Sequence, residues 1–133
     1  REDEAGVTPD FLIVGAAKSG TTWLGQALHQ NPANFLVPHE VHYFSRHFGD
    51  MSPQQYEALF AASRAEQRRG EKSNSYLTDP YAAQRIREAL PGVRLVAILR
   101  CPIDRAYSGY CMRLRRGKAS PDIGAYLDPA GAR

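Results

Sequence analysis

The fold is decided by one stretch near the start of the chain, Phe11-Leu12-Ile13-Val14-Gly15-Ala16-Ala17-Lys18-Ser19-Gly20-Thr21-Thr22-Trp23. Its first four residues are all apolar, which predicts a strand buried on both faces, as in a parallel sheet. The small residues from Gly15 to Gly20 predict a turn, and a helix is predicted from Thr21 to Gln30. Such a turn directs backbone N–H groups and the positive end of a helix at one point, so it predicts an anion-binding loop.

The rest of the chain alternates between strand and helix patterns. This order favours an α/β fold: a three-layer, P-loop-like domain with a central parallel sheet flanked by helices. The last helix carries an apolar face at helical spacing, and the chain after it is predicted to be loop-like. The predicted elements are a strand at 35–37, a helix from 53 to 69, an extended segment at 71–77, a helix from 80 to 90, a strand at 94–100 and a helix from Pro102 with Ile103, Ala106, Tyr107, Tyr110, Cys111 and Leu114 on its packed face.

The composition excludes several classes of protein. Of the 133 residues, 43% are hydrophobic and 23% are charged, which excludes a disordered chain and a disulfide scaffold. No apolar run approaches the ~20 residues of a membrane span. No signal-peptide pattern is visible and the two cysteines lack metal-ligand spacing, so we expect reduced thiols and a cytoplasmic location. The chain begins without Met and ends without a closing element, so we expect a piece of a longer protein.

The charge is distributed unevenly. Residues 1–84 carry 7 Lys/Arg and 10 Asp/Glu, whereas residues 85–133 carry 10 Lys/Arg and 4 Asp/Glu. A basic second part is typical of a protein with an anionic partner, although a solvated basic face has the same composition. Most of the cations are arginines, which favours phosphate as the group recognised.

The loop differs from the Walker A pattern of nucleotide triphosphatases. Gly15, Gly20 and Thr22 fit that pattern, but its lysine belongs at position 21 and here lies at Lys18. The strand at 94–100 ends in Arg100 where a Walker B strand has an acidic residue. The sequence therefore disfavours a Mg²⁺-dependent phosphoryl transferase, while a strand–helix turn without any ligand stays an alternative.

Four segments of the sequence together resemble the motifs of a known family. They are Lys-Ser-Gly-Thr-Thr-Trp at 18–23, Pro-His-Glu-Val-His-Tyr-Phe at 38–44, Gly-Glu-Lys-Ser-Asn-Ser-Tyr-Leu at 70–77, and the strand and helix of 94–109. In this order they resemble the PAPS-dependent sulfotransferases (PAPS is 3′-phosphoadenosine-5′-phosphosulfate), in particular the heparan-sulfate-type and bacterial branch. The first segment resembles the 5′-phosphosulfate loop and the last resembles the 3′-phosphate motif of that family.

The resemblance implies a role for each matching residue. Lys18 would contact the 5′-phosphate and the bridging oxygen, in a loop whose other donor-binding residues are Ser19, Gly20, Thr21, Thr22 and Trp23. Arg100 and Ser108 would bind the 3′-phosphate. Glu40 would be the general base, with His42 as the rival base because its ordinary pKa is close to neutral. Lys72 would steady the sulfuryl group or the base, and no metal is required.

The resemblance also implies an activity, with alternatives. We expect a sulfotransferase of the EC 2.8.2 type that moves a sulfuryl group in line from PAPS to a hydroxyl or amine of a carbohydrate, lipid or small molecule, with adenosine 3′,5′-bisphosphate as product and no nucleic-acid partner or membrane span. The alternatives are a P-loop kinase or NTPase and a non-catalytic nucleotide-binding module. Residues 1–9 are expected to be a flexible lead-in, and residues 10–133 the PAPS-binding part of a domain whose C-terminal part is absent.

Two residues depart from the family pattern. The family usually has Asp where Cys101 follows Arg100, and Cys is a poor helix cap, so the start of the last helix is in question. Asn74 stands where the family often has Pro.

Overall fold

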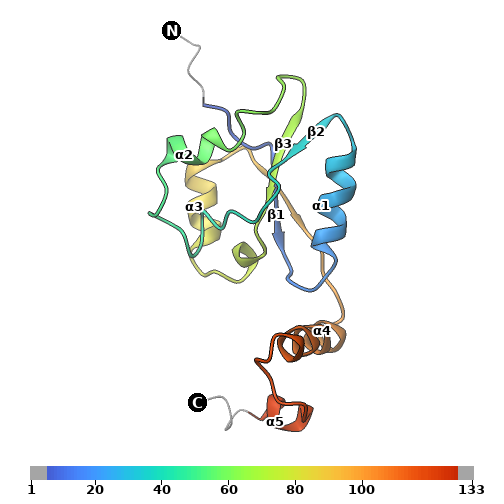
Figure 1. Ribbon diagram of the computed structural model, residues 1–133. Helices are drawn as coiled ribbons and strands as arrows, with labels where there is room; N and C mark the ends of the chain where they lie inside the picture. The colour runs from blue at the N-terminus through green and yellow to red at the C-terminus, as the bar shows by residue number, and fades with distance from the viewer. Residues whose placement is uncertain (1–5, 129–133) are drawn as a thin grey trace. The chain divides into compact units, whose positions relative to one another are not determined.

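The computed structural model describes residues 6–128, which form two compact units, one ending at Leu99 and one beginning at Arg100. The first unit holds a four-stranded parallel sheet with the strand order β2-β3-β1-β4 (Figure 1). The predicted α/β class is therefore confirmed. Of the expected lead-in, residues 1–5 lie outside the described part of the chain. The strands are β1 (Phe11–Gly15), β2 (Asn34–Leu36), β3 (Arg68–Lys72) and β4 (Arg94–Ala97).

Strand β1 is the centre of this sheet, and all five of its residues are buried. Its register places Phe11 beside Gly70 of β3, and Ile13 beside both Lys72 of β3 and Val96 of β4. A Cβ atom on Gly70 would lie 2.2 Å from the ring of Phe11, so any larger residue would have to displace this buried ring. The predicted pattern of a strand that is buried on both faces is correct.

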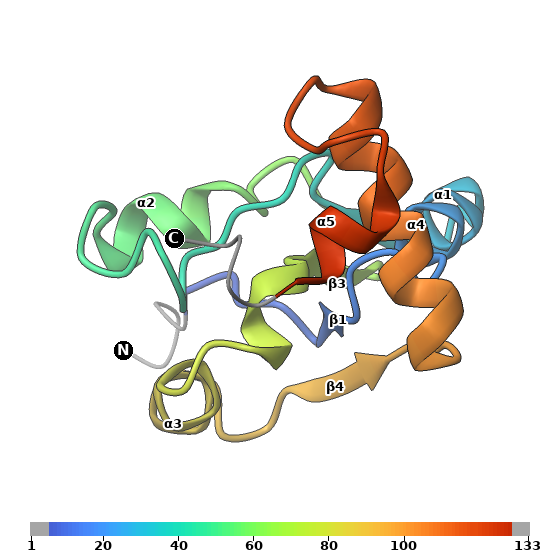
Figure 2. The ribbon, with the colours of Figure 1, turned by 90° about the horizontal axis from the view of Figure 1, so that it is seen from below.

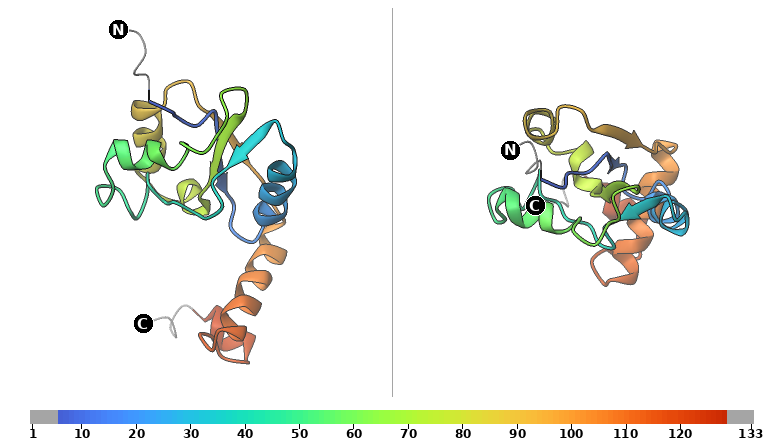
Figure 3. Two further views of the ribbon diagram at one scale, coloured as in Figure 1. Left: turned by 45° about the horizontal axis from the view of Figure 1, so that its top comes forward. Right: turned by 90° about the horizontal axis from the view of Figure 1, so that it is seen from above.

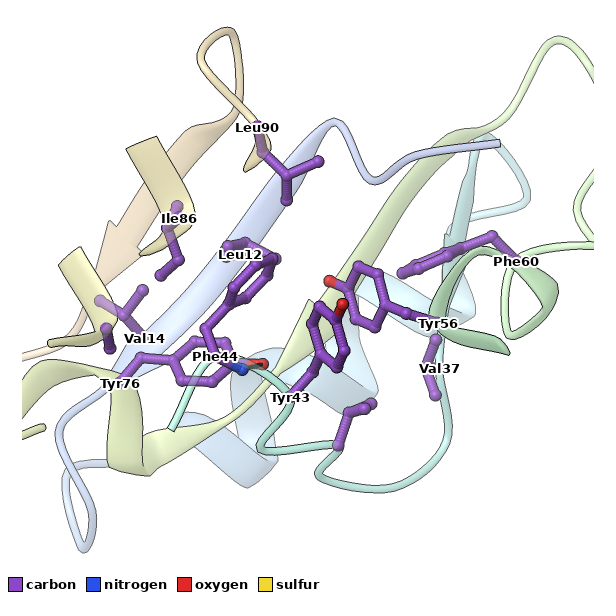
Figure 4. Close-up of a cluster of buried hydrophobic side chains, with 12 residues drawn as sticks. Leu12, Val14, Val37, Tyr43, Phe44, Tyr56, Phe60, Tyr76, Ile86 and Leu90 are labelled. Atoms are coloured by element: carbon purple, nitrogen blue, oxygen red, sulfur yellow. Dashed lines mark hydrogen bonds between the residues drawn. The ribbon is translucent and has the colours of Figure 1, made fainter. Parts of the chain in front are cut away.

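Helices cover both faces of the sheet (Figure 1, Figure 2). On one face, helix α1 (Thr21–Gln30) packs Leu24 and Leu28 against Ile13. On the other face, helices α2 (Pro53–Ala58) and α3 (Ala82–Ala89) enclose an aromatic core around Leu12, in which the rings of Tyr43 and Tyr56 stack 4.3 Å apart (Figure 4). Alternate residues of β1 thus supply the two cores.

The helix predicted from 53 to 69 is wrong in its second half. Ser52 begins α2 as predicted, with a capping box that also uses Gln55. The helix ends at Ala58, however, and residues 68–72 pair with both β2 and β1 as strand β3. Tertiary hydrogen bonding in a buried sheet thus overrides the local helical pattern.

The segment predicted to be extended from 71 to 77 divides into two parts. Its first two residues belong to β3, whereas Asn74–Leu77 forms a 3-10 helix, η1. The start of α3 shifts as well, because Asp79 Oδ1 accepts hydrogen bonds from the N–H groups of Tyr81 and Ala82 and the helix begins at Ala82.

The second unit contains α4 (Pro102–Arg115) and α5 (Ile123–Leu127), which lie side by side (Figure 3). The sequence pattern predicts a loop where α5 lies, and this prediction is wrong. Helix α5 follows a turn in which Tyr110 of α4 donates to the carbonyls of Ser120 and Pro121, and the rings of Tyr110 and Tyr126 are 5.0 Å apart.

The predicted packed face of α4 is largely wrong. Only Tyr110 is buried in this helix, whereas Ile103 is 78% exposed and Tyr107 is 59% exposed. Helix α5 is only five residues long, which is too short to cover one face of the 14-residue helix α4. In the described residues, no helix combines the length and the hydropathy that a membrane crossing needs.

Candidate active site

The loop between β1 and α1 lies at the carboxyl edge of the sheet, where ligands bind in open α/β folds. Lys18, with φ 63°, and Gly20, with φ 93°, both adopt left-handed backbone conformations. Gly20 is the N-cap of α1 and has no side chain to accept from the N–H groups of the first turn. The loop therefore presents the positive end of α1 without a protein cap.

One side chain in this loop has an unused hydrogen-bonding atom. Within residues 6–128, the buried side-chain atoms without a partner are Ser19 Oγ and Asn74 Oδ1. Asn74 lies beside the start of the loop, since its carbonyl oxygen is 3.2 Å from the position of a Cβ on Gly15. Buried polar atoms are seldom left unpaired, so the hydroxyl of Ser19 fits a ligand that accepts a hydrogen bond, such as a phosphate oxygen.

The remaining loop residues differ in exposure. Thr21 is buried at the first position of α1, whereas Thr22 is exposed and Trp23 is 71% exposed. Of the predicted donor-binding side chains of this segment, Thr22 and Trp23 are thus the ones open to solvent.

A second group of predicted residues meets at the same edge of the sheet. Glu40 follows β2 and Lys72 ends β3, and these strands are neighbours. Glu40 Oε1 lies 3.4 Å from Lys72 Nζ, and Glu40 Oε2 lies 3.1 Å from His42 Nε2. The fold thus brings together the three residues that the sequence singled out around the base.

The two rival bases are not equally accessible. The side chain of His42 is 6% exposed and that of Glu40 is 28% exposed. Burial, with a smaller contribution from Arg46, lowers the pKa of His42. A neutral His42 can donate from Nε2 to Glu40 while its Nδ1 accepts from the hydroxyl of Ser75, 2.6 Å away. His42 thus contacts both Glu40 and Ser75 and is the less exposed of the two rival bases.

A second carboxylate, that of Glu71, lies next to this group and was given no role by sequence reasoning. Glu71 is fully buried, and its oxygens accept from the hydroxyls of Tyr56 at 3.0 Å, Tyr76 at 2.5 Å and Ser73 at 2.7 Å. Burial raises the pKa of Glu71, against the effect of these three hydrogen bonds. Two of its partners, Ser73 and Tyr76, lie close to Glu71 within the quoted segment 70–77, whereas Tyr56 comes from α2.

A cavity of about 230 Å³ opens beside Lys72, between α1 and the end of β2. The stem of Lys72 passes under α1 at Gly25, where a Cβ would lie 3.8 Å from Lys72 Cδ. The cavity is lined by Thr22, Gly25, Gln26, His29, Leu36, Val37, Pro38 and Lys72.

The predicted 3′-phosphate residues belong to the second unit. Arg100 is exposed and precedes α4, and Ser108 is half-buried within α4. Cys101 caps α4 without a side-chain hydrogen bond, which agrees with the question raised by the Arg-Cys-Pro sequence. As for metals, the described residues contain no group of three or more His, Cys, Asp or Glu side chains placed to hold an ion.

Comparison with known proteins identifies the family. A family model described as "Sulfotransferase domain" matches residues 8–123. The chain belongs to the sulfotransferase family. A crystal structure of a sulfotransferase from Alicyclobacillus acidocaldarius superposes with a TM-score of 0.82 at 32% identity, covering 90% of this chain and 56% of that one.

Two relatives illustrate the range of this family. Heparan sulfate glucosamine 3-O-sulfotransferase 6 of Mus musculus is 32% identical over 117 residues, covering 88% of this chain and 34% of that protein. Membrane-associated sulfotransferase kil1 of Dictyostelium discoideum is 27% identical over 128 residues, covering 85% and 25%. The chain thus spans about a quarter to a third of the length of these relatives.

Proposed function

We propose that this protein is a PAPS-dependent sulfotransferase of the EC 2.8.2 type in which Glu40 is the general base. The observation that carries the proposal is the position of Glu40 between Lys72 and His42, at the same sheet edge as the anion-binding loop. Sulfuryl transfer to a hydroxyl needs both an anion-binding loop and a base, and this edge holds the residues for each.

The loop residues fit the donor. PAPS supplies the sulfuryl group, and adenosine 3′,5′-bisphosphate is the product. Lys18 and the N–H groups at the start of α1 would hold the 5′-phosphate, together with the unpaired hydroxyl of Ser19. Arg100 and Ser108 are the proposed 3′-phosphate residues.

Glu40 would take the proton of the acceptor hydroxyl during in-line transfer. Its side chain is partly exposed, so a substrate can reach it, while Lys72 and His42 fix its two oxygens. Lys72 Nζ also places a positive charge where negative charge develops during the transfer.

For the acceptor, we propose a hydroxyl of a carbohydrate. Several relatives are named for heparan sulfate, among them the mouse glucosamine 3-O-sulfotransferase 6 and the bifunctional N-deacetylase/N-sulfotransferase 1 of Caenorhabditis briggsae. The cavity is lined by Lys72, the ion-pair partner of the proposed base, and this supports entry of the acceptor from that side.

The test is transfer of ³⁵S from labelled PAPS to a panel of heparan sulfate, desulfated heparan sulfate, glycolipids and simple phenols by the full-length protein. We expect labelled product, and a Lys18→Ala variant with normal folding should bind adenosine 3′,5′-bisphosphate about 10- to 100-fold more weakly, because a charge-assisted contact is lost. Wild-type affinity in that variant would show that the loop is assigned wrongly.

A binding comparison separates the alternatives. Thermal stabilisation by ATP·Mg²⁺ and not by adenosine 3′,5′-bisphosphate would indicate a P-loop kinase or NTPase. Binding of adenosine 3′,5′-bisphosphate without transfer to any acceptor would indicate a non-catalytic module.

A further inference from the structure

One hydroxyl ties the segment that carries Glu40 to the centre of the sheet. Ser73 is fully buried, and its backbone N–H donates to the carbonyl of Ile13 in β1 at 3.0 Å. Its Oγ accepts from the N–H groups of Val41 at 3.1 Å and His42 at 2.8 Å. The residues on either side of the peptide bond between Val41 and His42 are thus attached, through one side chain, to the central strand.

This attachment acts where the backbone needs support. His42 has φ 56°, a left-handed conformation that non-glycine residues seldom adopt and that persists only where the surroundings enforce it. Residues 40–42 belong to no helix or strand, so the ladder of the sheet does not hold them. The two hydrogen bonds to Ser73 replace that ladder directly next to Glu40.

Glu71 in turn orients the hydroxyl of Ser73. A serine hydroxyl has one hydrogen to donate and two lone pairs to accept with. Here the hydrogen points to Glu71 Oε2 at 2.7 Å, which leaves both lone pairs for Val41 and His42. The tyrosine hydroxyls of Tyr56 and Tyr76 hold the other carboxylate oxygen, Oε1. Every hydrogen-bonding position of Ser73 is used.

We propose that Ser73, oriented by Glu71, is a positioning residue for catalysis: it fixes the backbone at residues 41–42 so that Glu40 stays between Lys72 and His42. This inference rests on the proposed function of Glu40. Neither Ser73 nor Glu71 touches the substrate in this scheme. Both act through the placement of Glu40, and a displacement of about 1 Å at a reacting group can cost a hundredfold in rate.

The experiment compares Ser73→Ala with the wild type in the full-length protein. We expect kcat for ³⁵S transfer from PAPS to fall about 10- to 100-fold, while the affinity for adenosine 3′,5′-bisphosphate and the KM for the acceptor change less than threefold, because only the base is displaced. Ser73→Thr keeps the hydroxyl and should retain a kcat within about threefold of the wild type.

Ser63→Ala is the matched control. Ser63 Oγ also makes two hydrogen bonds, to the carbonyl of Phe60 at 2.6 Å and from Arg69 Nε at 2.8 Å, but neither involves the segment that carries Glu40. It should lower the melting temperature without lowering kcat. An equal loss of kcat in Ser63→Ala and Ser73→Ala would show that Ser73 contributes only to stability.

A double-mutant cycle tests whether Ser73 acts through Glu40. In a Glu40→Gln background, Ser73→Ala should cause no further fall in kcat, since there is no base left to misplace. A full additional loss would overturn the inference. If the wild type transfers sulfate and Glu40→Gln keeps its rate, the proposed function of Glu40 fails instead, which is a distinguishable result.

A measurement on the wild type covers the case in which Ser73→Ala does not fold or no acceptor is sulfated. The amide hydrogens of Val41 and His42 should exchange as slowly as those of β1, although they have no backbone acceptor. Exchange at the rate of exposed loops would contradict the inference without bearing on the sulfotransfer reaction.

Discussion

Glu40 and Glu71 lie near each other in the fold, but their surroundings differ. Glu71 is fully buried and accepts from three hydroxyl groups, whereas Glu40 is partly exposed and lies between an ammonium and an imidazole. The negative charge of Glu40 adds to the burial that raises the pKa of Glu71.

The difference in burial and in hydrogen-bond partners suits the two carboxylates to different roles. Neutral donors in a dry interior fix the geometry of Glu71 and leave no room for a substrate. Partial exposure leaves Glu40 within reach of an acceptor hydroxyl, beside the ammonium group of Lys72. We therefore propose a structural role for Glu71 and a catalytic role for Glu40, and substitutions at these two residues test this assignment.

The largest effect is expected for the exposed carboxylate. Glu40→Gln should lower kcat for sulfate transfer about 10²- to 10⁴-fold, because an amide cannot accept the proton of the acceptor hydroxyl. Isothermal titration with adenosine 3′,5′-bisphosphate should give wild-type affinity. If His42→Gln shows this pattern and Glu40→Gln does not, the two residues exchange roles.

The next largest effect is a loss of stability on substitution of Glu71. In Glu71→Gln, an NH₂ group faces a Ser73 hydroxyl whose lone pairs are already used, so a buried donor loses its acceptor. We expect the free energy of unfolding in urea to fall by about 1–3 kcal/mol. The control is Glu88→Gln on the exposed face of α3, which should stay within about 0.5 kcal/mol of the wild type. A Glu71→Gln variant with the unfolding free energy of the wild type would contradict the structural role of Glu71.

The smallest expected effect is a change in the stability of the folded protein with pH, and the raised pKa of Glu71 fixes its sign. The folded state raises the pKa of Glu71 above its ordinary value of 4.5, so between 4.5 and the raised value the folded protein binds more protons than the unfolded chain. Stability from Glu71 should therefore fall as pH rises through that window. The difference between wild-type and Glu71→Gln unfolding curves isolates this slope, and a difference that rises with pH would contradict the assignment.

The sequence predicted the elements that local chemistry dictates. The apolar run before Gly15 specified a strand buried on both faces, and Ser52 with Pro53 specified a helix start. It also indicated that Glu40, His42 and Lys72 belong together, through the family resemblance, and the fold brings them within hydrogen-bonding distance.

What the sequence did not predict depends on partners far along the chain. Strand β3 has a polar sequence that continues a helical pattern, and only its pairing with β1 and β2 makes it a strand. The role of Glu71 depends in part on the hydroxyl of Tyr56 on α2, which no local pattern connects to β3. The roles of Arg100 and Ser108 and the cytoplasmic location stay predictions.

The central claim is that the carboxylate of Glu40 takes the proton of the acceptor, and chemical rescue tests it most directly. The measurement is ³⁵S transfer by Glu40→Ala in rising concentrations of sodium formate, against sodium chloride at equal ionic strength. We predict that formate restores transfer in proportion to its concentration, because a small carboxylate can occupy the space left by the side chain. No response to formate, together with recovery of His42→Gly by imidazole, would contradict the claim.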